Sequence, residues 1–203
     1  MTIFYKLFSK LYVNITNACP CSCVFCLRQS GDGVGDAKNL WLEHEPDIAE
    51  IKEAFNRCDL GDVDEIVFCG YGEPMERADI VIEICKYIKT KCDLPLRINT
   101  NGLAKLINPE FEMSNLSVIE SVSVSLNACN EEEYQRITCS CFGESSFQAM
   151  KNFALEAKKY TSVCFTAVDI ISEEQIERCR TLAAGMGIPF RVRAFVGNNE
   201  SYS

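Results

Sequence analysis

The sequence predicts an α/β fold, an open partial TIM-type (β/α)6 barrel with parallel strands. Six short apolar runs rich in β-forming residues recur along the 203-residue chain. Some of them, such as EIVFC, are continuous rather than alternating, as expected for strands covered on both faces. The six predicted strands are Leu11–Thr16, Glu65–Cys69, Leu96–Thr100, Ser121–Leu126, Val163–Asp169 and Phe190–Phe195.

Helical patterns lie between these runs. Apolar residues at helical spacing mark four segments: Pro46–Cys58, Ala78–Lys89, Ser146–Tyr160 and Ser172–Met186. The last of them opens with Ser172 followed three residues later by Gln175, which is a capping-box signal. Alternating strands and helices predict parallel strands joined by right-handed crossovers, and six such units make about three-quarters of an eight-unit barrel. In such sheets, functional side chains collect at the carboxyl ends of the strands.

Composition excludes several classes of protein. The net charge of −9 and the pI near 4.8 argue against a nucleic-acid binder, which needs clustered Lys and Arg. No stretch approaches the roughly 18 apolar residues of a membrane span. The thirteen cysteines are an odd number and follow no signal peptide, so we expect reduced thiols in the cytoplasm rather than a disulfide framework.

Three cysteines form a C-x3-C-x2-C triplet directly after the first predicted strand: Cys19, Cys23 and Cys26. Thiolates are soft anionic ligands suited to iron–sulfur clusters, and short spacings let one loop wrap a cluster. Three ligands for four irons leave one iron open to a substrate, as in catalytic zinc sites. The triplet alone also fits a structural zinc knuckle with Cys21 as fourth ligand, a redox pair of Cys23 and Cys26, or buried cysteines.

Polar and glycine-rich segments follow the next three strands. CGYGEP ends the second strand, where Gly70 and Gly72 allow close backbone approach to a ligand and Glu73 offers a carboxylate to a cation. INTNG ends the third strand, and its short polar side chains followed by glycine form a turn that can bind a sugar. SLNA ends the fourth and places Ser125 and Asn127 at the same mouth. In isolation, a glycine-rich turn capped by Pro74 explains the first segment better, and a strand-to-helix turn explains the second equally well.

The triplet, with Phe25 just before its last cysteine, resembles the signature of the radical SAM superfamily. The resemblance implies a 4Fe–4S cluster held by the three cysteines and S-adenosylmethionine bound to the open iron through its methionine amino and carboxylate groups. Reductive cleavage then yields a 5′-deoxyadenosyl radical, which abstracts hydrogen from an unknown small substrate. The resemblance also implies an electron donor such as flavodoxin or ferredoxin.

The same resemblance assigns roles to the other motifs. GYGEP stands where the family carries Gly-Gly-Glu-Pro, a motif that holds the methionine ammonium; Tyr71 replaces the first glycine. The INTNG segment stands where the ribose and the methionine carboxylate are contacted. With the residues at the ends of the fourth and sixth strands, the predicted cofactor contacts are Phe25, Tyr71, Gly72, Glu73, Pro74, Asn99, Thr100, Asn101, Ser125, Asn127 and Arg193.

The assignment of Arg193 also rests on the last strand. Arg191 and Arg193 alternate with Val192 and Ala194, so both arginines share one face. If this face is the barrel interior, Arg193, nearer the mouth, is the better ligand for a cofactor or substrate carboxylate. A solvated edge strand explains the pattern equally well.

Three further features receive no catalytic role. His44, the single histidine, precedes a helix and is expected at the surface. The GDGVGD segment, residues 31–36, follows a cysteine loop rather than a strand and is interpreted as a connection. Cys139 and Cys141 lack further spaced partners, so unpaired cysteines are favoured over an auxiliary cluster.

Within the superfamily, the chain is most similar to the small TatD-associated radical SAM proteins. LYVNITNACPCSCVFCLR, NLWLEHEP, FCGYGEP and FRVRAF carry that similarity. We expect residues 1–203 to form a single radical SAM core domain. Two other functions stay open: an activase that places a radical on a partner protein, and a zinc- or thiol-binding module.

Overall fold

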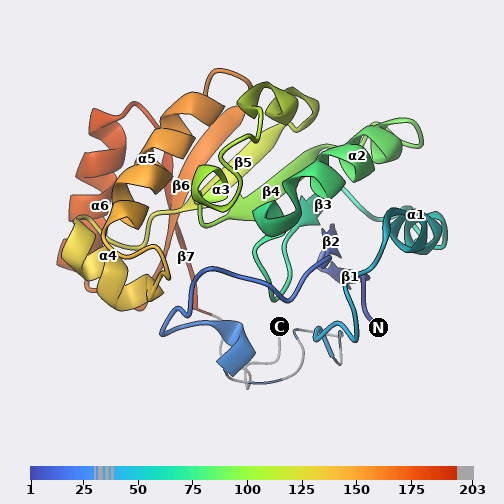
Figure 1. Cartoon of the computed structure of the whole chain (residues 1–203), viewed down its shortest axis with the longest axis horizontal. Helices are drawn as coiled ribbons and strands as arrows, with labels where there is room; N and C mark the ends of the chain where they lie inside the picture. The colour runs from blue at the N-terminus through green and yellow to red at the C-terminus, as the bar shows by residue number, and fades with distance from the viewer. Residues whose placement is uncertain (30, 32–33, 35–36, 38, 196–203) are drawn as a thin grey trace.

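A computed structural model describes residues 1–29, 31, 34, 37 and 39–195 of the chain. Its strands form one seven-stranded sheet in the order β1-β2-β3-β4-β5-β6-β7 (Figure 1). Strands β2 to β7 pair in parallel, and β1 pairs antiparallel to β2 at the edge. The strands are β1 (Phe4–Leu7), β2 (Lys10–Val13), β3 (Glu65–Phe68), β4 (Leu96–Thr100), β5 (Ser121–Ser125), β6 (Ser162–Val168) and β7 (Phe190–Arg193). The predicted open parallel sheet is confirmed, with one added antiparallel strand.

The α-helices lie along the outer side of the sheet, while the loop that follows β2 (blue in Figure 1) runs toward the end of β7. The α-helices are α1 (Ile48–Asn56), α2 (Ala78–Lys89), α3 (Ala104–Ile107), α4 (Glu131–Thr138), α5 (Ser145–Ala157) and α6 (Glu173–Gly185). Short 3-10 helices are η1 (Leu27–Gln29), η2 (Pro74–Arg77) and η3 (Met113–Val118). Among the described residues, no helix is both long and apolar enough to cross a bilayer.

Local signals explain where the main helices begin. Asp47 caps α1 in a capping box with Glu50, and Ser172 caps α6 in a capping box with Gln175. The predicted bounds of α2 match the structure, since its apolar stripe is continuous. Helix α4 was not predicted, because its first turn is three glutamates and its charged composition hides the apolar face.

The two faces of the sheet differ in character. Ile66, Ile98 and Val122 are fully buried and belong to the apolar core. Because strand side chains alternate, Glu65 and Arg97 project from the opposite, inner face. The inner face is therefore polar, and it forms the floor of the site described below.

Candidate active site

The cysteine loop leaves the carboxyl end of β2 and is fixed at several points. The Arg28 guanidinium donates hydrogen bonds to the Asn17 carbonyl at 2.9 Å and the Cys21 carbonyl at 3.4 Å. The backbone N–H groups of Ser22 and Val24 donate to carbonyls at the end of α4, each at 3.0 Å. The loop is thus held both by its own arginine and by α4.

Inside this loop, the thiol of Cys21 lies against those of Cys19 and Cys23. Cys21 is buried with 3% of its surface exposed, whereas Cys19 and Cys23 are half-buried. The hydrogen bond from Cys21 lowers the pKa of Cys19 to about 7 and also lowers the pKa of Cys23. The pKa of Cys21 is raised, first by these two hydrogen bonds and then by burial. Cys21 therefore contributes a protonated thiol that donates to its neighbours.

Cys26 is linked to Cys23 through the backbone. Its backbone N–H donates to the Cys23 carbonyl at 3.0 Å, and both cysteines line the same cavity. In the described part of the chain, no three Cys, His, Asp or Glu side chains are placed to hold a single metal ion. A tetrahedral zinc site needs sulfurs about 3.8 Å apart, from Zn–S distances of about 2.3 Å. No three side chains among the described residues have this arrangement, whereas the ligands of an iron–sulfur cluster each bind their own iron.

The Glu73 carboxylate joins the second and third motifs. It accepts hydrogen bonds from the Thr100 hydroxyl at 2.6 Å, the Asn101 N–H at 2.7 Å and the Met75 N–H at 3.0 Å. Burial raises the pKa of Glu73 to about 7, although these hydrogen bonds oppose the rise. An ionised carboxylate has about four acceptor positions, so one position is left for an outside donor.

The second motif also packs directly on the cysteine loop. The Glu73 N–H donates to the Ala18 carbonyl at 2.8 Å. A Cβ atom at Gly72 would lie 2.3 Å from the Thr16 carbonyl oxygen and 2.6 Å from that of Ala18. Only glycine allows this approach of two backbones. Pro74 follows as the first residue of η2 and is buried.

The third motif faces the same junction. Thr100 donates to Glu73 and accepts from the Gly102 N–H at 3.0 Å. The Asn101 amide nitrogen lies 3.8 Å from the Cys21 sulfur, and its oxygen accepts from the Leu103 N–H. The three motif loops thus form one hydrogen-bonded unit.

A cavity of about 420 Å³ opens beside this unit. Six of the residues predicted from the sequence line it: Cys23, Phe25, Cys26, Tyr71, Asn99 and Arg193. The Tyr71 hydroxyl donates to the Gly31 carbonyl at 2.6 Å, and the edge of its ring meets Trp41. Exposed apolar side chains, Phe8 and Phe195, line the same cavity.

The fourth motif does not reach this lining. Asn127 is buried in a left-handed conformation with φ of 53°, and its side-chain oxygen accepts from the Val168 N–H at 3.2 Å. Ser125 is half-buried at the end of β5. The geometry gives Asn127 a role in joining the ends of β5 and β6, which the sequence did not indicate.

Two residues missed in the sequence stand out in the structure. Arg28 closes the cysteine loop, and Arg97 is held between Glu65 and Asn99 on the inner face. The alternation L-R-I-N-T in β4 places Arg97 and Asn99 on one face and was the available signal. Of the two arginines on β7, Arg191 is exposed and Arg193 is largely enclosed.

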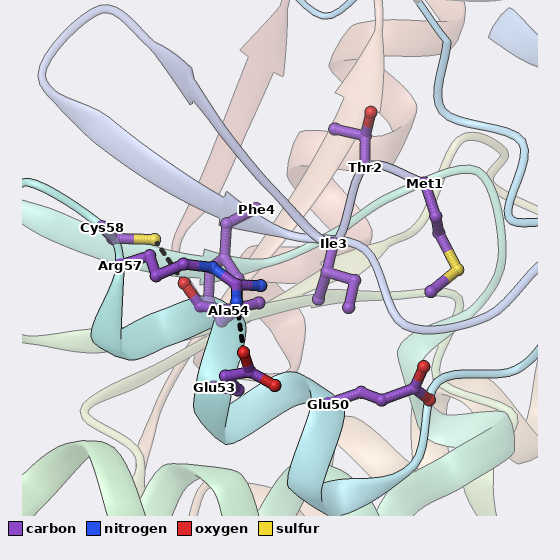
Figure 2. A pocket seen from close by; sticks show the side chains of 9 residues that line it. All are labelled: Met1, Thr2, Ile3, Phe4, Glu50, Glu53, Ala54, Arg57 and Cys58. Atoms are coloured by element: carbon purple, nitrogen blue, oxygen red, sulfur yellow. Dashed lines mark hydrogen bonds and ion pairs between the residues drawn. The ribbon is translucent and has the colours of Figure 1, made fainter.

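A second hollow of about 410 Å³ lies between the N-terminal segment and α1 (Figure 2). Figure 2 shows the Glu53–Arg57 pair and Cys58 among its lining side chains. It contains none of the predicted site residues.

Three features were given no catalytic role: His44, the cysteines Cys139 and Cys141, and the GDGVGD segment. His44 is exposed and contacts Glu50 at 2.9 Å. Cys139 and Cys141 are exposed, and within the described chain neither forms a disulfide. Most of the GDGVGD segment, residues 32, 33, 35 and 36, lies outside the described residues.

Comparison with known proteins identifies this arrangement. The family model of the radical SAM superfamily matches residues 13–183, so the chain belongs to that superfamily. It is a class of enzymes whose cofactors are a 4Fe–4S cluster and S-adenosylmethionine. The narrower TatD-associated assignment stays a prediction.

Two curated relatives come from Methanocaldococcus jannaschii. One, named "Probable GTP 3′,8-cyclase", is 32% identical over 129 residues, which are 64% of this chain and 40% of that protein. The other, named as a glycyl-radical enzyme activating enzyme, is 35% identical over 106 residues, 51% of this chain and 41% of that protein. The chain thus spans about two-fifths of the length of these relatives.

Solved structures share the fold. SuiB from Streptococcus suis, bound to S-adenosylmethionine, superposes with a TM-score of 0.64 at 17% identity, over 95% of this chain and 40% of that one. Native anSMEcpe with bound AdoMet gives a TM-score of 0.60 at 16% identity, over 95% and 54% of the two chains. At these identities the likeness concerns the fold alone.

Proposed function

We propose that this chain binds a 4Fe–4S cluster through Cys19, Cys23 and Cys26 and cleaves S-adenosylmethionine reductively. The observation that carries the proposal is the contact of Glu73 with all three motif loops: its N–H meets Ala18, and its carboxylate meets Thr100 and Asn101. Loops separated by more than 80 residues in the sequence therefore meet beside one cavity. When bound, the cluster and cofactor supply a 5′-deoxyadenosyl radical.

The residues of the chain fit this pair of cofactors. The donor set is three thiols of one loop, and two of them, Cys23 and Cys26, face the cavity. Cys19 carries a pKa near 7, so its thiolate is accessible at neutral pH. The remaining acceptor position of Glu73 suits the methionine ammonium. Thr100 and Asn101 orient that carboxylate, and Phe25, Tyr71 and Asn99 line the space beside it.

Anaerobic reconstitution tests the proposal. The protein is loaded with iron and sulfide, reduced with dithionite and supplied with S-adenosylmethionine. We expect brown protein that forms 5′-deoxyadenosine and methionine in equal amounts. Stoichiometric zinc binding with no iron uptake and no cleavage would instead favour the zinc-binding module.

A second candidate is activation of a partner protein. The cavity mouth carries Phe8, which is 69% exposed, and Phe195, which is 38% exposed, and Val24 nearby on the cysteine loop is 59% exposed. Exposed apolar side chains around an open site favour docking of a macromolecule. The relative named as an activating enzyme supports this candidate as well. Deuterium transfer from a deuterated partner protein into 5′-deoxyadenosine would favour this second candidate, provided that deuterated small-molecule extracts give no such transfer.

A further inference from the structure

The floor of the cavity presents hydrogen-bond donors from three strands. Tyr12 of β2, Asn99 of β4 and Arg193 of β7 all line it. What this floor can bind depends on which polar atoms of these three residues already have hydrogen-bond partners. The inference rests on the proposed function, because it concerns the substrate of the same cavity.

An acidic side chain on this face is already paired. Glu65 accepts from Arg97 through two parallel hydrogen bonds, Nε to Oε1 at 2.9 Å and Nη2 to Oε2 at 2.8 Å. Its Oε2 also accepts from Lys10 at 2.6 Å. Two protein cations thus neutralise this carboxylate, which has little left to offer a ligand cation.

Arg97 also fixes the orientation of Asn99. Its Nη1 donates to the Asn99 Oδ1 at 2.5 Å. A guanidinium has no acceptor, so the amide must turn its oxygen toward Arg97. The group that Asn99 offers is therefore its NH₂; one of its two N–H bonds is directed at the Cys69 thiol, which leaves the other for a ligand in the cavity.

The side chain of Tyr12 likewise has its oxygen toward Arg97. Burial raises its pKa, and the neighbouring Arg97 guanidinium acts in the opposite direction by donating toward the phenol oxygen. With its oxygen facing a cation, the phenol has its O–H proton to donate.

Arg193 adds the charge. Its Nε is enclosed and has no hydrogen-bond partner among the described residues. Burial lowers its pKa most; the Cys69 thiol and the Tyr12 phenol raise it, whereas the nearby Arg191 and Arg97 guanidinium groups lower it. A desolvated cation beside other cations gains most from an anion in contact with it.

We propose that this floor binds an oxyanion of the substrate, a carboxylate or a phosphate, paired with Arg193 and hydrogen-bonded by Asn99 and Tyr12. Arg97 is the positioning residue that turns the Asn99 amide toward that anion. The substrate would then be held by its anionic end on the floor, with its remainder directed toward the cysteine loop at the mouth.

Calorimetric titration of the reconstituted protein, saturated with S-adenosylmethionine, tests the inference. Saturation fills the cofactor carboxylate site before the probes are added. The probes are inorganic phosphate, acetate and neutral glycerol. We expect phosphate or acetate to bind at millimolar concentration and glycerol not to bind, and the stronger anion indicates which oxyanion the floor prefers.

Variants assign the binding to residues. Arg193→Gln should weaken anion binding at least tenfold, and Arg193→Lys should weaken it less because the charge stays. Arg191→Gln is the matched control, since it removes an exposed arginine two positions away on the same strand, and should change binding less than twofold. Asn99→Asp keeps an acceptor for Arg97 but removes the donor, so it should weaken anion binding at least tenfold.

Several results would overturn the inference. One is equal binding of anions and glycerol by the unmodified protein. Another is an equal loss of anion affinity in Arg191→Gln and Arg193→Gln. A third is weaker S-adenosylmethionine binding in Arg193→Gln with unchanged anion binding. Reductive cleavage is measured on the same samples. A protein that cleaves the cofactor but does not distinguish anions contradicts this inference alone, whereas failure to cleave contradicts the proposed function.

Discussion

The Glu73 carboxylate and the Thr100 hydroxyl are 2.6 Å apart, and this contact joins the carboxyl ends of β3 and β4. The pair is buried, with Glu73 4% and Thr100 2% exposed. Through the N–H of Glu73, the same junction reaches the cysteine loop at Ala18. Hydrogen bonds within the protein itself thus join the three motif loops of the site.

Glu73→Gln should weaken S-adenosylmethionine binding at least tenfold. The substitution removes the charge proposed to meet the methionine ammonium, and charge-assisted hydrogen bonds contribute about 1.5–3 kcal/mol. The introduced NH₂ faces N–H donors, which lowers the free energy of unfolding, whereas loss of a buried carboxylate with a raised pKa acts in the opposite direction, so binding is the readout. Equilibrium binding to the reconstituted protein measures this loss of affinity. Glu76→Gln, three residues further on, is the control and should leave the dissociation constant unchanged; an unchanged constant in Glu73→Gln would contradict the assigned role.

Gly72→Ala should disturb the cysteine loop. The added methyl group would lie 2.3 Å from a backbone oxygen, which cannot move aside as a flexible side chain can. We expect a stability loss of about 3 kcal/mol and reduced iron uptake. Urea unfolding and iron analysis measure both. Gly185→Ala is the matched control: it ends α6 with open space around the new Cβ, so it should be neutral or stabilising by up to about 1 kcal/mol. Equal effects of the two substitutions would argue against the packing role of Gly72.

Glu65→Gln should destabilise the fold in a pH-dependent manner. Burial raises the pKa of Glu65, but hydrogen bonds from Arg97 and Lys10 lower it by more, so the pKa lies below its usual value of 4.5. A folded-state pKa below the unfolded one stabilises the fold above about pH 4.5, and this contribution is lost as pH falls through the folded pKa. The gap in unfolding free energy between the unmodified protein and Glu65→Gln should be about 2 kcal/mol at pH 7 and should shrink in acid.

Urea unfolding at pH 7 and pH 3.5 measures this gap. Glu53→Gln removes half of the exposed pair with Arg57 and should change stability by less than about 0.5 kcal/mol at either pH. A gap for Glu65→Gln that stays constant with pH would show that the Arg97 pairing does not shift this carboxyl group.

The parallel sheet could be predicted because its signals are local. Runs such as Glu65–Cys69 are apolar along their whole length, and Ala78–Lys89 carries a clear helical stripe. Strand β1 was missed because its four residues are only half-buried, and its turn uses Phe8 at φ of 53° rather than a glycine or asparagine signal. Helix α4 was missed because its short apolar face, Tyr134 and Ile137, follows a first turn of three glutamates.

The site was predicted only in part, because contacts across strands depend on register. The motifs at the strand ends predicted that Cys23, Tyr71 and Asn99 belong to one site, and all three line the same cavity. No local pattern indicates that Arg97, whose backbone pairs with Val67, reaches Glu65 and turns the amide of Asn99. The contact of Cys21 with Cys19 and Cys23 likewise depends on how the loop folds, while spacing alone set Cys21 apart from the predicted ligands.

Cys21 therefore makes the decisive comparison possible within a single loop. The measurement is iron per chain, with 5′-deoxyadenosine formation, after anaerobic reconstitution of four single cysteine-to-serine variants. Cys19→Ser, Cys23→Ser and Cys26→Ser should each lower iron from about four per chain to below one and abolish cleavage. Cys21→Ser should keep both iron and cleavage. Loss of iron in Cys21→Ser together with full iron content in Cys26→Ser would contradict the account.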